Sequence, residues 1–362
     1  LLFAQRLLVP VVITDLDQDR IDKGLAYVGG EIDKLEQRGR INGDRAQRLR
    51  GLVTGSVTKE AFADADFVIE AVFEDLQVKK RVFAEVEAVV SETCVLATNT
   101  SSLSVSAMAA DLSHPERVVG FHFFNPVAVM PLLEVVRADR TDDPTLATAF
   151  AVGKALKKSC VLVKDAPAFV VNRLLTRFMG EITRSVDEGT DIAVADNALS
   201  PLGLPMSPFV LLALVGPAVA LHVSETMHQA FPDRFYVSEN LRRLVQAGKT
   251  GIWSWEGGSR HVDPEVEALF VEGSGTGGRA GGHPLTDEQV RARALSAMAE
   301  EIRLMLDEGV VADPEDIDLC MIMGAGWPFH LGGITPYLDR EGWSERVTGA
   351  RFLTPGVAGL SS

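Results

Sequence analysis

The strongest constraint on the fold of this chain is a change of pattern near residue 166. Before this point, short apolar runs alternate with segments whose apolar residues recur at helical spacing. The expected strands are residues 9–14, 67–72, 94–98, 118–124, 131–136 and 160–163, and the expected helices are residues 1–7, 21–37, 43–50, 75–90 and 145–156. This alternation is typical of a parallel, doubly wound sheet. After Asp165 the pattern is wholly helical. The sequence therefore predicts an α/β domain over residues 1–165, followed by an all-α region.

The helical region contains an internal repeat. Residues 181–189 resemble residues 301–309, an offset of 301 − 181 = 120, and residues 203–205 resemble residues 326–328. We therefore expect two tandem, related helical domains. The first covers residues 166–258 and the second residues 286–350, and a Gly-rich connector is expected between them over residues 259–285.

The two copies differ at one position that bears on chemistry. Asn172 lies nine residues before Glu181, whereas Ala292 lies nine residues before Glu301. Only the first copy therefore carries an amide there that could reach a substrate oxygen. We expect the second copy to be a structural partner of the first.

A histidine and a carboxylate are candidates for a general base. His122 ends one apolar run and Glu134 lies inside the next, so the two meet if these runs lie side by side in one sheet. A carboxylate on one imidazole nitrogen fixes the tautomer and raises the basicity of the other nitrogen. The alternative is a histidine that is simply packed in the core beside phenylalanine.

Further polar residues follow apolar runs. Asn99 and Ser101 come directly after one expected strand, where an open α/β sheet carries its ligand-binding groups. Asp15 ends the first expected strand, either as an acceptor for the ribose of a dinucleotide or as the N-cap of the next helix.

Four ordered motifs carry a resemblance to a known family. They are the runs 99–102 (NTSS), 122–126 (HFFNP), 132–136 (LLEVV) and 164–173 (KDAPAFVVNR). In this order they resemble the 3-hydroxyacyl-CoA dehydrogenases, and most closely the dehydrogenase part of the multifunctional alpha subunit of bacterial fatty-acid oxidation complexes. The resemblance implies an incomplete Rossmann-like domain that binds NAD and oxidises L-3-hydroxyacyl-CoA to 3-oxoacyl-CoA.

The resemblance also implies roles for single residues. His122 would be the base, oriented by Glu134, while Ser101 would bind the substrate hydroxyl or the nicotinamide end and Asn172 the thioester carbonyl. The residues implied on the cofactor side are Asp15, Glu74, Lys79, Asn99, Ser101 and Asn125. For Glu74 and Lys79 the alternative is an ion pair on a solvated helix start.

The family pattern also sets expectations about the surroundings of the chain. Members of the family have a first strand and a Gly-rich turn that bind the pyrophosphate, and both would precede Leu1. We expect the chain to be a piece of a longer protein; the alternative is a protein that no longer binds NAD well. The resemblance further implies an acyl-CoA substrate, a possible enoyl-CoA hydratase domain upstream and a thiolase subunit as partner.

Composition excludes several other classes of protein. The net charge of −15 disfavours nucleic acid, whose phosphates would be repelled. The three cysteines are far apart and match no metal-ligand spacing, so we expect reduced thiols in a cytoplasmic protein and no metal. No apolar run is long enough for a membrane span.

Two other functions each fit part of the sequence. A 3-hydroxy acid dehydrogenase that does not use CoA would be expected to carry a lysine base near Asn172, and the sequence has none there. A non-catalytic scaffold in a β-oxidation complex is favoured by the lack of a glycine loop and opposed by the intact pair His122 and Glu134.

Overall fold

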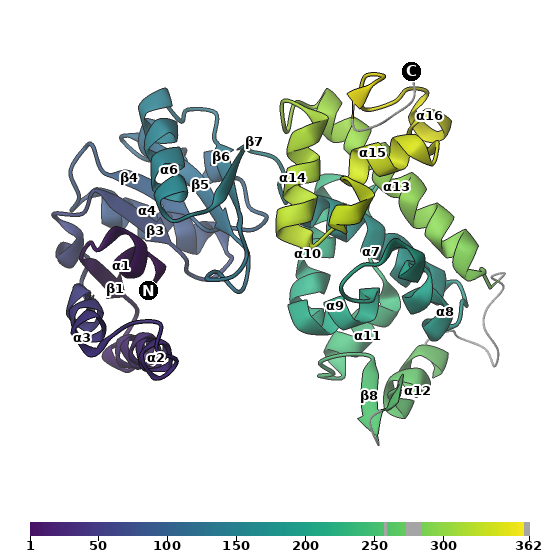
Figure 1. Cartoon of the computed structure of the whole chain (residues 1–362), viewed down its shortest axis with the longest axis horizontal. Coiled ribbons are helices and arrows are strands. Elements are labelled where there is room, and N and C mark those ends of the chain that lie inside the picture. Colours follow the sequence, from purple (N-terminus) through teal and green to yellow (C-terminus); the bar gives the residue numbers. More distant parts are fainter. Residues whose placement is uncertain (257–258, 273–283, 358–362) are drawn as a thin grey trace. The chain divides into compact units, whose positions relative to one another are not determined.

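A computed structural model of the chain describes residues 1–256, 259–272 and 284–357 (Figure 1). The chain forms two compact units, Leu1–Asp165 and Ala166–Ser362. The division falls at the point where the sequence changes from alternating to helical patterns. Unit 1 is coloured purple to blue in Figure 1, and unit 2 is coloured teal to yellow.

Unit 1 is an α/β domain whose elements follow the predicted alternation. Its elements are α1 (Leu2–Leu7), β1 (Val11–Thr14), α2 (Gln18–Gln37), α3 (Gly43–Leu52), β2 (Val53–Ser56), η1 (Lys59–Phe62), β3 (Phe67–Glu70), α4 (Leu76–Glu87), β4 (Val95–Thr98), α5 (Val105–Ala109), η2 (Pro115–Arg117), β5 (Val118–Phe123), β6 (Leu132–Arg137), α6 (Asp143–Ala155) and β7 (Ser159–Lys164). Asn42 caps α3 by accepting a hydrogen bond from the Arg45 backbone N–H, at 3.0 Å. The strand β2 was not predicted from the sequence.

Five strands form the main sheet in the order β3-β4-β5-β6-β7. Neighbouring strands run parallel except for β5 and β6, which are antiparallel. The prediction of a parallel sheet is therefore wrong for this one pair. The physical reason is the connection over residues 124–131, which is too short for the crossover that parallel neighbours need.

Helices cover both faces of this sheet. A Cβ atom built on Gly120 would lie 3.2 Å from a methyl of Val105 on α5, whereas the ring of the next residue, Phe121, approaches Gly153 on α6. Because successive residues of a strand face opposite sides, α5 and α6 lie on opposite faces. The core on the α6 side consists of buried aliphatic and aromatic residues, namely Val95, Ala97, Val119, Phe121, Leu133, Val135, Leu146, Ala149 and Leu156.

The first strand lies outside the main sheet. Strands β1 and β2 form a separate parallel pair, with Val11 opposite Val53 and Thr14 opposite Ser56. All four residues of β1 are half-buried rather than buried. The predicted strand over residues 9–14 is therefore only partly covered, because β2 is its one strand neighbour among the described residues.

Unit 2 is mainly helical. Its elements are α7 (Val171–Asp187), α8 (Ile192–Asn197), η3 (Ser200–Leu202), α9 (Pro208–Val215), α10 (Pro217–Ala230), α11 (Glu239–Gln246), β8 (Trp253–Glu256), β9 (Ser259–Val262), α12 (Pro264–Glu272), α13 (Asp287–Asp307), α14 (Pro314–Ala325), η4 (Phe329–Leu331), α15 (Ile334–Arg340) and α16 (Trp343–Thr348). The antiparallel hairpin of β8 and β9 contradicts the prediction of a wholly helical region.

The predicted connector over residues 259–285 is also corrected in part. Strand β9 and helix α12 occupy residues 259–272. Residues 273–282, on which the prediction of a Gly-rich connector rested, fall within the gap at 273–283 and so lie outside the described residues.

The two repeats pack against each other through α7 and α13, and their ion pairs are reciprocal. Arg173 in the first repeat contacts Glu301 and Glu308 in the second, at 2.6 and 2.7 Å. Arg293, at 173 + 120 = 293, contacts the equivalent carboxylates of the first repeat. These are Glu181 at 2.7 Å and Glu188 at 2.5 Å. The repeats therefore form a pseudo-twofold pair within one compact unit.

Candidate active site

His122 and Glu134 lie directly opposite each other on β5 and β6, as the sequence indicates. The imidazole Nδ1 is 2.6 Å from the Glu134 Oε2 atom, and both side chains are buried. Two residues earlier, Gly120 lies opposite Val136, and a Cβ atom there would come within 2.4 Å of the Val136 Cβ. The glycine therefore allows the close approach of the two strands beside the pair.

This geometry determines which imidazole nitrogen is available as a base. An ionised carboxylate can only accept hydrogen bonds, so Nδ1 of His122 carries the proton that points to Glu134. The lone pair then resides on Nε2, the other ring nitrogen. Such a pair can remove a proton from an alcohol and hold the resulting positive charge against the carboxylate.

The Glu74 carboxylate accepts hydrogen bonds from polar groups that follow β4. Its Oε1 atom accepts hydrogen bonds from the Thr100 hydroxyl at 2.7 Å, the Ser101 backbone N–H at 2.8 Å and the Ser101 hydroxyl at 3.2 Å. Burial alone would raise the pKa of Glu74, but these hydrogen bonds and the nearby Lys79 ammonium outweigh burial and lower the pKa. Glu74 is thus held as a carboxylate beside Ser101.

Lys79 is buried, which excludes the alternative of a solvated surface pair. Its ammonium lies 2.8 and 3.0 Å from the two oxygens of Glu70 and 3.2 Å from Glu74. The Thr98 hydroxyl donates to Glu70 at 2.6 Å, and the Val72 backbone N–H donates to it at the same distance. Glu70 therefore fixes the position of the lysine.

Glu70 was not predicted as a site residue. The available signal was an acidic residue inside the apolar run Phe67-Val68-Ile69-Glu70-Ala71-Val72. A buried carboxylate requires a partner, and Lys79 nine residues later was the candidate cation.

The remaining predicted residues of unit 1 occupy different settings. The side-chain oxygen of Asn99 accepts a hydrogen bond from the Phe123 backbone N–H at 2.9 Å, which ties the end of β4 to β5 beside the histidine. Asn125 is exposed in the loop after β5. Asp15 is exposed after β1 and lies 3.7 Å from Arg20, and Asp17 rather than Asp15 caps α2. The N-cap alternative for Asp15 is therefore wrong.

Asn172 lies in the first turn of α7, at the start of unit 2. Unit 1 brings together the ends of β3, β4 and β5 with Glu74, Ser101 and His122, and Asn172 belongs to the other compact unit. Its participation in the same site therefore stays a prediction.

Two features are absent from the described residues, namely a group of side chains for a metal ion and a single membrane-spanning helix. Within residues 1–256, 259–272 and 284–357, no group of three or more His, Cys, Asp or Glu side chains is arranged to hold a metal ion. In the same ranges, no single helix combines the length and apolar composition needed to cross a membrane. The pair α9 and α10 meets both conditions together, with a bend of 98° between the two helices.

Comparison with known proteins gives matches along most of the chain. Residues 1–166 match the family described as "3-hydroxyacyl-CoA dehydrogenase, NAD binding domain", and residues 169–260 match its "C-terminal domain". The fatty acid oxidation complex subunit alpha of Psychrobacter cryohalolentis is 32% identical over 345 residues, covering 92% of this chain and 48% of that protein. The chain thus spans about half the length of the curated relatives it matches.

Solved structures give the same result. An (S)-3-hydroxybutyryl-CoA dehydrogenase from Ralstonia eutropha has a TM-score of 0.64 and 30% identity, over 68% of this chain and 88% of that one. A 3-hydroxybutyryl-CoA dehydrogenase from Escherichia coli has a TM-score of 0.74 over 95% of this chain and 91% of that one, and at 23% identity it supports the fold alone. The resemblance predicted from the four motifs is confirmed. This chain belongs to the 3-hydroxyacyl-CoA dehydrogenase family and contains its NAD-binding and C-terminal domains.

Proposed function

We propose that the chain oxidises L-3-hydroxyacyl-CoA to 3-oxoacyl-CoA with NAD as the hydride acceptor, as a step of fatty-acid β-oxidation. The observation that carries this proposal is the buried contact of 2.6 Å between His122 Nδ1 and Glu134 Oε2. A base with one nitrogen fixed by a carboxylate suits the removal of a hydroxyl proton.

Four residues of the chain have a part in the proposed reaction. Nε2 of His122 takes the proton of the substrate 3-hydroxyl group, and Glu134 stabilises the imidazolium that results. Ser101 orients that hydroxyl group, while Asn172 donates a hydrogen bond to the thioester carbonyl. Bound NAD would supply the acceptor for the hydride that leaves C3, the carbon that bears this hydroxyl group, so that the alcohol becomes a ketone.

The polar residues of unit 1 fit a dinucleotide. In open α/β sheets, ligands bind beyond the carboxyl ends of the parallel strands, and Glu74, Lys79 and Ser101 gather there. Phe73 is 85% exposed beside this polar group, which suits a flat ring that is partly apolar. Asp15, exposed after β1, would accept from a ribose hydroxyl, and Asn99 and Asn125 flank the end of β5.

The name of the relatives supports a proposal about the partners with which this activity occurs. Because the matched relatives are subunits of a fatty acid oxidation complex, we propose an upstream enoyl-CoA hydratase domain and a thiolase subunit as partners. Cys94, Cys160 and Cys320 carry reduced thiols, which suits the reducing cytoplasm, where we expect the protein to act.

The test compares two histidine variants. His122→Gln should lower turnover of 3-hydroxybutyryl-CoA by about 10²-fold or more, measured as NADH formation, with little change in NADH affinity. His114→Gln is the matched control, since His114 is a partly buried histidine of the same unit that contacts Glu116 at 3.1 Å. Near-normal turnover of His122→Gln would exclude the proposed base. A wild-type chain that binds NADH and acyl-CoA without turnover would instead favour the scaffold.

A further inference from the structure

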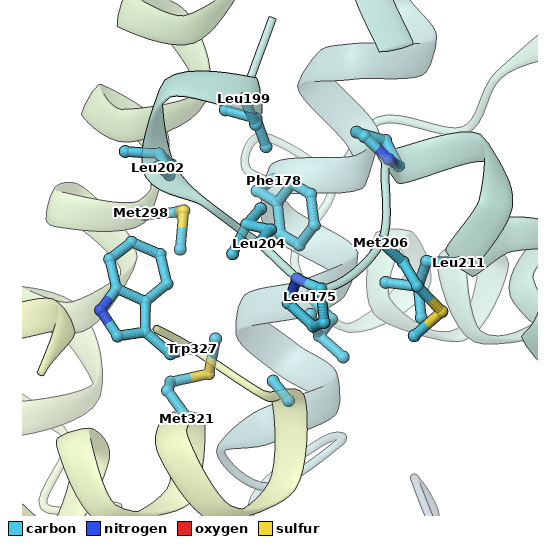
Figure 2. Close-up of a pocket in the computed structure, with 13 residues that line it drawn as sticks. Leu175, Phe178, Leu199, Leu202, Leu204, Met206, Leu211, Met298, Met321 and Trp327 are labelled. Atoms are coloured by element: carbon cyan, nitrogen blue, oxygen red, sulfur yellow. The ribbon is translucent and has the colours of Figure 1, made fainter. Parts of the chain in front are cut away.

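An apolar cavity lies between the two repeats of unit 2. Its walls come from α7, from the segment that runs from α8 into α9, and from α13 and α14 of the second repeat (Figure 2). The cavity has a volume of about 540 Å³, including the part open to solvent. The space open to the centre of a water-sized group is only about 40 Å³, so the cavity can take a short apolar segment and not a whole ligand.

The chemistry of the walls restricts what the cavity can hold. Every lining side chain is Leu, Met, Phe, Pro, Ala or Trp. A site without polar partners does not hold ordered water, so the favoured occupant is an apolar group. Three of the nine methionines of the chain, Met206, Met298 and Met321, line the cavity. Their unbranched thioether side chains adapt to occupants of different length, as an alkyl chain would require.

Helix α7 links this cavity to the predicted substrate site. Asn172, Leu175 and Met179 are partly exposed and lie along one stripe of the helix, while the opposite side is buried against α13. Leu175 lines the cavity one turn after Asn172, and the buried Phe178 lies deeper along the same wall. An acyl group whose carbonyl is held by Asn172 would therefore have its hydrocarbon tail directed along α7 toward the cavity.

We propose that this cavity binds the distal end of the substrate's saturated acyl chain. The proposal rests on the proposed function, since it identifies the cavity as part of the site for the same substrate. The second repeat then has a role beyond support, because Met298, Met321 and Trp327 form one wall of the cavity. Each methylene buried there favours binding of a longer chain by about fourfold.

A binding experiment tests the cavity without reference to turnover. Trp327 is 4% exposed and lines the cavity, so a saturated fatty acid brominated at its terminal carbon should quench the fluorescence of this indole. The quenching should disappear in Trp327→Phe and persist in Trp343→Phe, which alters a tryptophan outside the cavity. Absence of quenching in the wild type, or unchanged quenching in Trp327→Phe, would overturn the proposal. So would equal quenching by brominated butyrate at the same concentration, because a shorter chain buries fewer methylene groups and should bind more weakly.

A kinetic experiment tests the link to the substrate. Met321→Phe should lower kcat/KM for a 3-hydroxyacyl-CoA of medium chain length by roughly tenfold more than it lowers that for 3-hydroxybutyryl-CoA. Met323→Phe, two residues further along α14 and outside the cavity, is the matched control and should change neither value. Met321→Ala, which enlarges the cavity, should shift the preference toward longer chains and serves if the larger side chain prevents folding.

The failures of the two proposals can be told apart. A wild-type chain that oxidises neither substrate contradicts the proposed function, while the quenching experiment still decides whether the cavity binds an alkyl chain. Equal loss of activity with short and long substrates in Met321→Phe, in a folded protein, contradicts the cavity proposal alone.

Discussion

At the scale of single residues, Glu134 determines how His122 can act. Glu134→Gln keeps the size of the side chain but removes the negative charge that stabilises an imidazolium. We expect turnover to fall by about 10²- to 10⁴-fold, and the acid limb of the pH–rate profile to move to lower pH. The measurement is kcat/KM for 3-hydroxybutyryl-CoA across the pH range. If the acid limb does not shift and turnover is unchanged in this variant, Glu134 has only a packing role.

The buried carboxyl group of Asp318 makes the free energy of unfolding depend on pH. It accepts hydrogen bonds from the Thr335 backbone N–H and hydroxyl, both at 2.7 Å. Burial raises the pKa of Asp318 from 3.8 to about 6, and the hydrogen bonds from Thr335 oppose this only in part. Because the folded state holds the proton more tightly than the unfolded state, this group favours folding at low pH. Its contribution is lost as the pH rises from 3.8 to about 6.

The variant Asp318→Asn should remove this pH dependence. The pKa difference of 6 − 3.8 = 2.2 corresponds to roughly 3 kcal/mol in the free energy of unfolding, as an order of magnitude. Urea unfolding at a series of pH values should therefore show a flatter profile for the variant than for the wild type. Asp307→Asn, which alters an exposed aspartate at the end of α13, is the control. If the variant keeps the wild-type slope of the free energy of unfolding against pH, Asp318 is not the source of that slope.

Some residue contacts followed from the sequence and others did not. The pairing of His122 with Glu134 was predictable because a short connection between two apolar runs requires neighbouring strands. The contact between Glu70 and Lys79 was not, because a lysine on an amphipathic helix is usually solvated. Whether Asn172 faces the same substrate depends on how the two units are arranged, which sequence patterns do not specify.

At the scale of elements, the packing of α7 on α13 depends on ion pairs that differ in burial. Arg173 and its partner Glu301 are both fully buried, whereas about a quarter of the Arg293 side chain is exposed. Arg173→Met leaves a buried carboxylate with more distant cations, and we expect a loss of about 3 kcal/mol in the free energy of unfolding. Arg293→Met, the matched variant at the equivalent position, should cost about 1 kcal/mol or less.

Urea denaturation of both variants provides the measurement. The double variant Arg173→Met with Glu301→Leu should recover part of the loss, because it removes the unpaired charge as well. Equal costs for Arg173→Met and Arg293→Met would show that burial does not set the strength of these contacts.

The elements themselves were largely predictable in unit 1, where α2 to α6 each begin after a residue whose side chain caps the helix, such as Asn42 or Asp75. The hairpin of β8 and β9 was missed, although Trp253-Ser254-Trp255-Glu256 alternates in the manner of a strand. A run of four residues is too short to distinguish from a loop. The reciprocal ion pairs were accessible from the repeat, since Arg173, Glu181 and Glu188 each recur 120 residues later.

At the scale of the whole molecule, the repeat bears on oligomeric state. The face of α7 that packs on α13 is already covered within this chain, so it is not open to a second copy of the chain. We therefore expect the chain to be a monomer. Light scattering over a range of protein concentrations provides the measurement, and a stable dimer would show that another surface mediates association.

The reciprocal contacts between the repeats also affect which amino-acid changes this molecule can accept. In a symmetric dimer of identical chains, one change in the gene alters both copies of a contact. Here Arg173 and Arg293 are encoded separately, so one contact can change while its counterpart is retained. Ala292 illustrates this freedom, since it stands at the position equivalent to Asn172 while the arginine beside it is kept. One half can thus lack the side chain that is predicted to bind the substrate, while the other half keeps it.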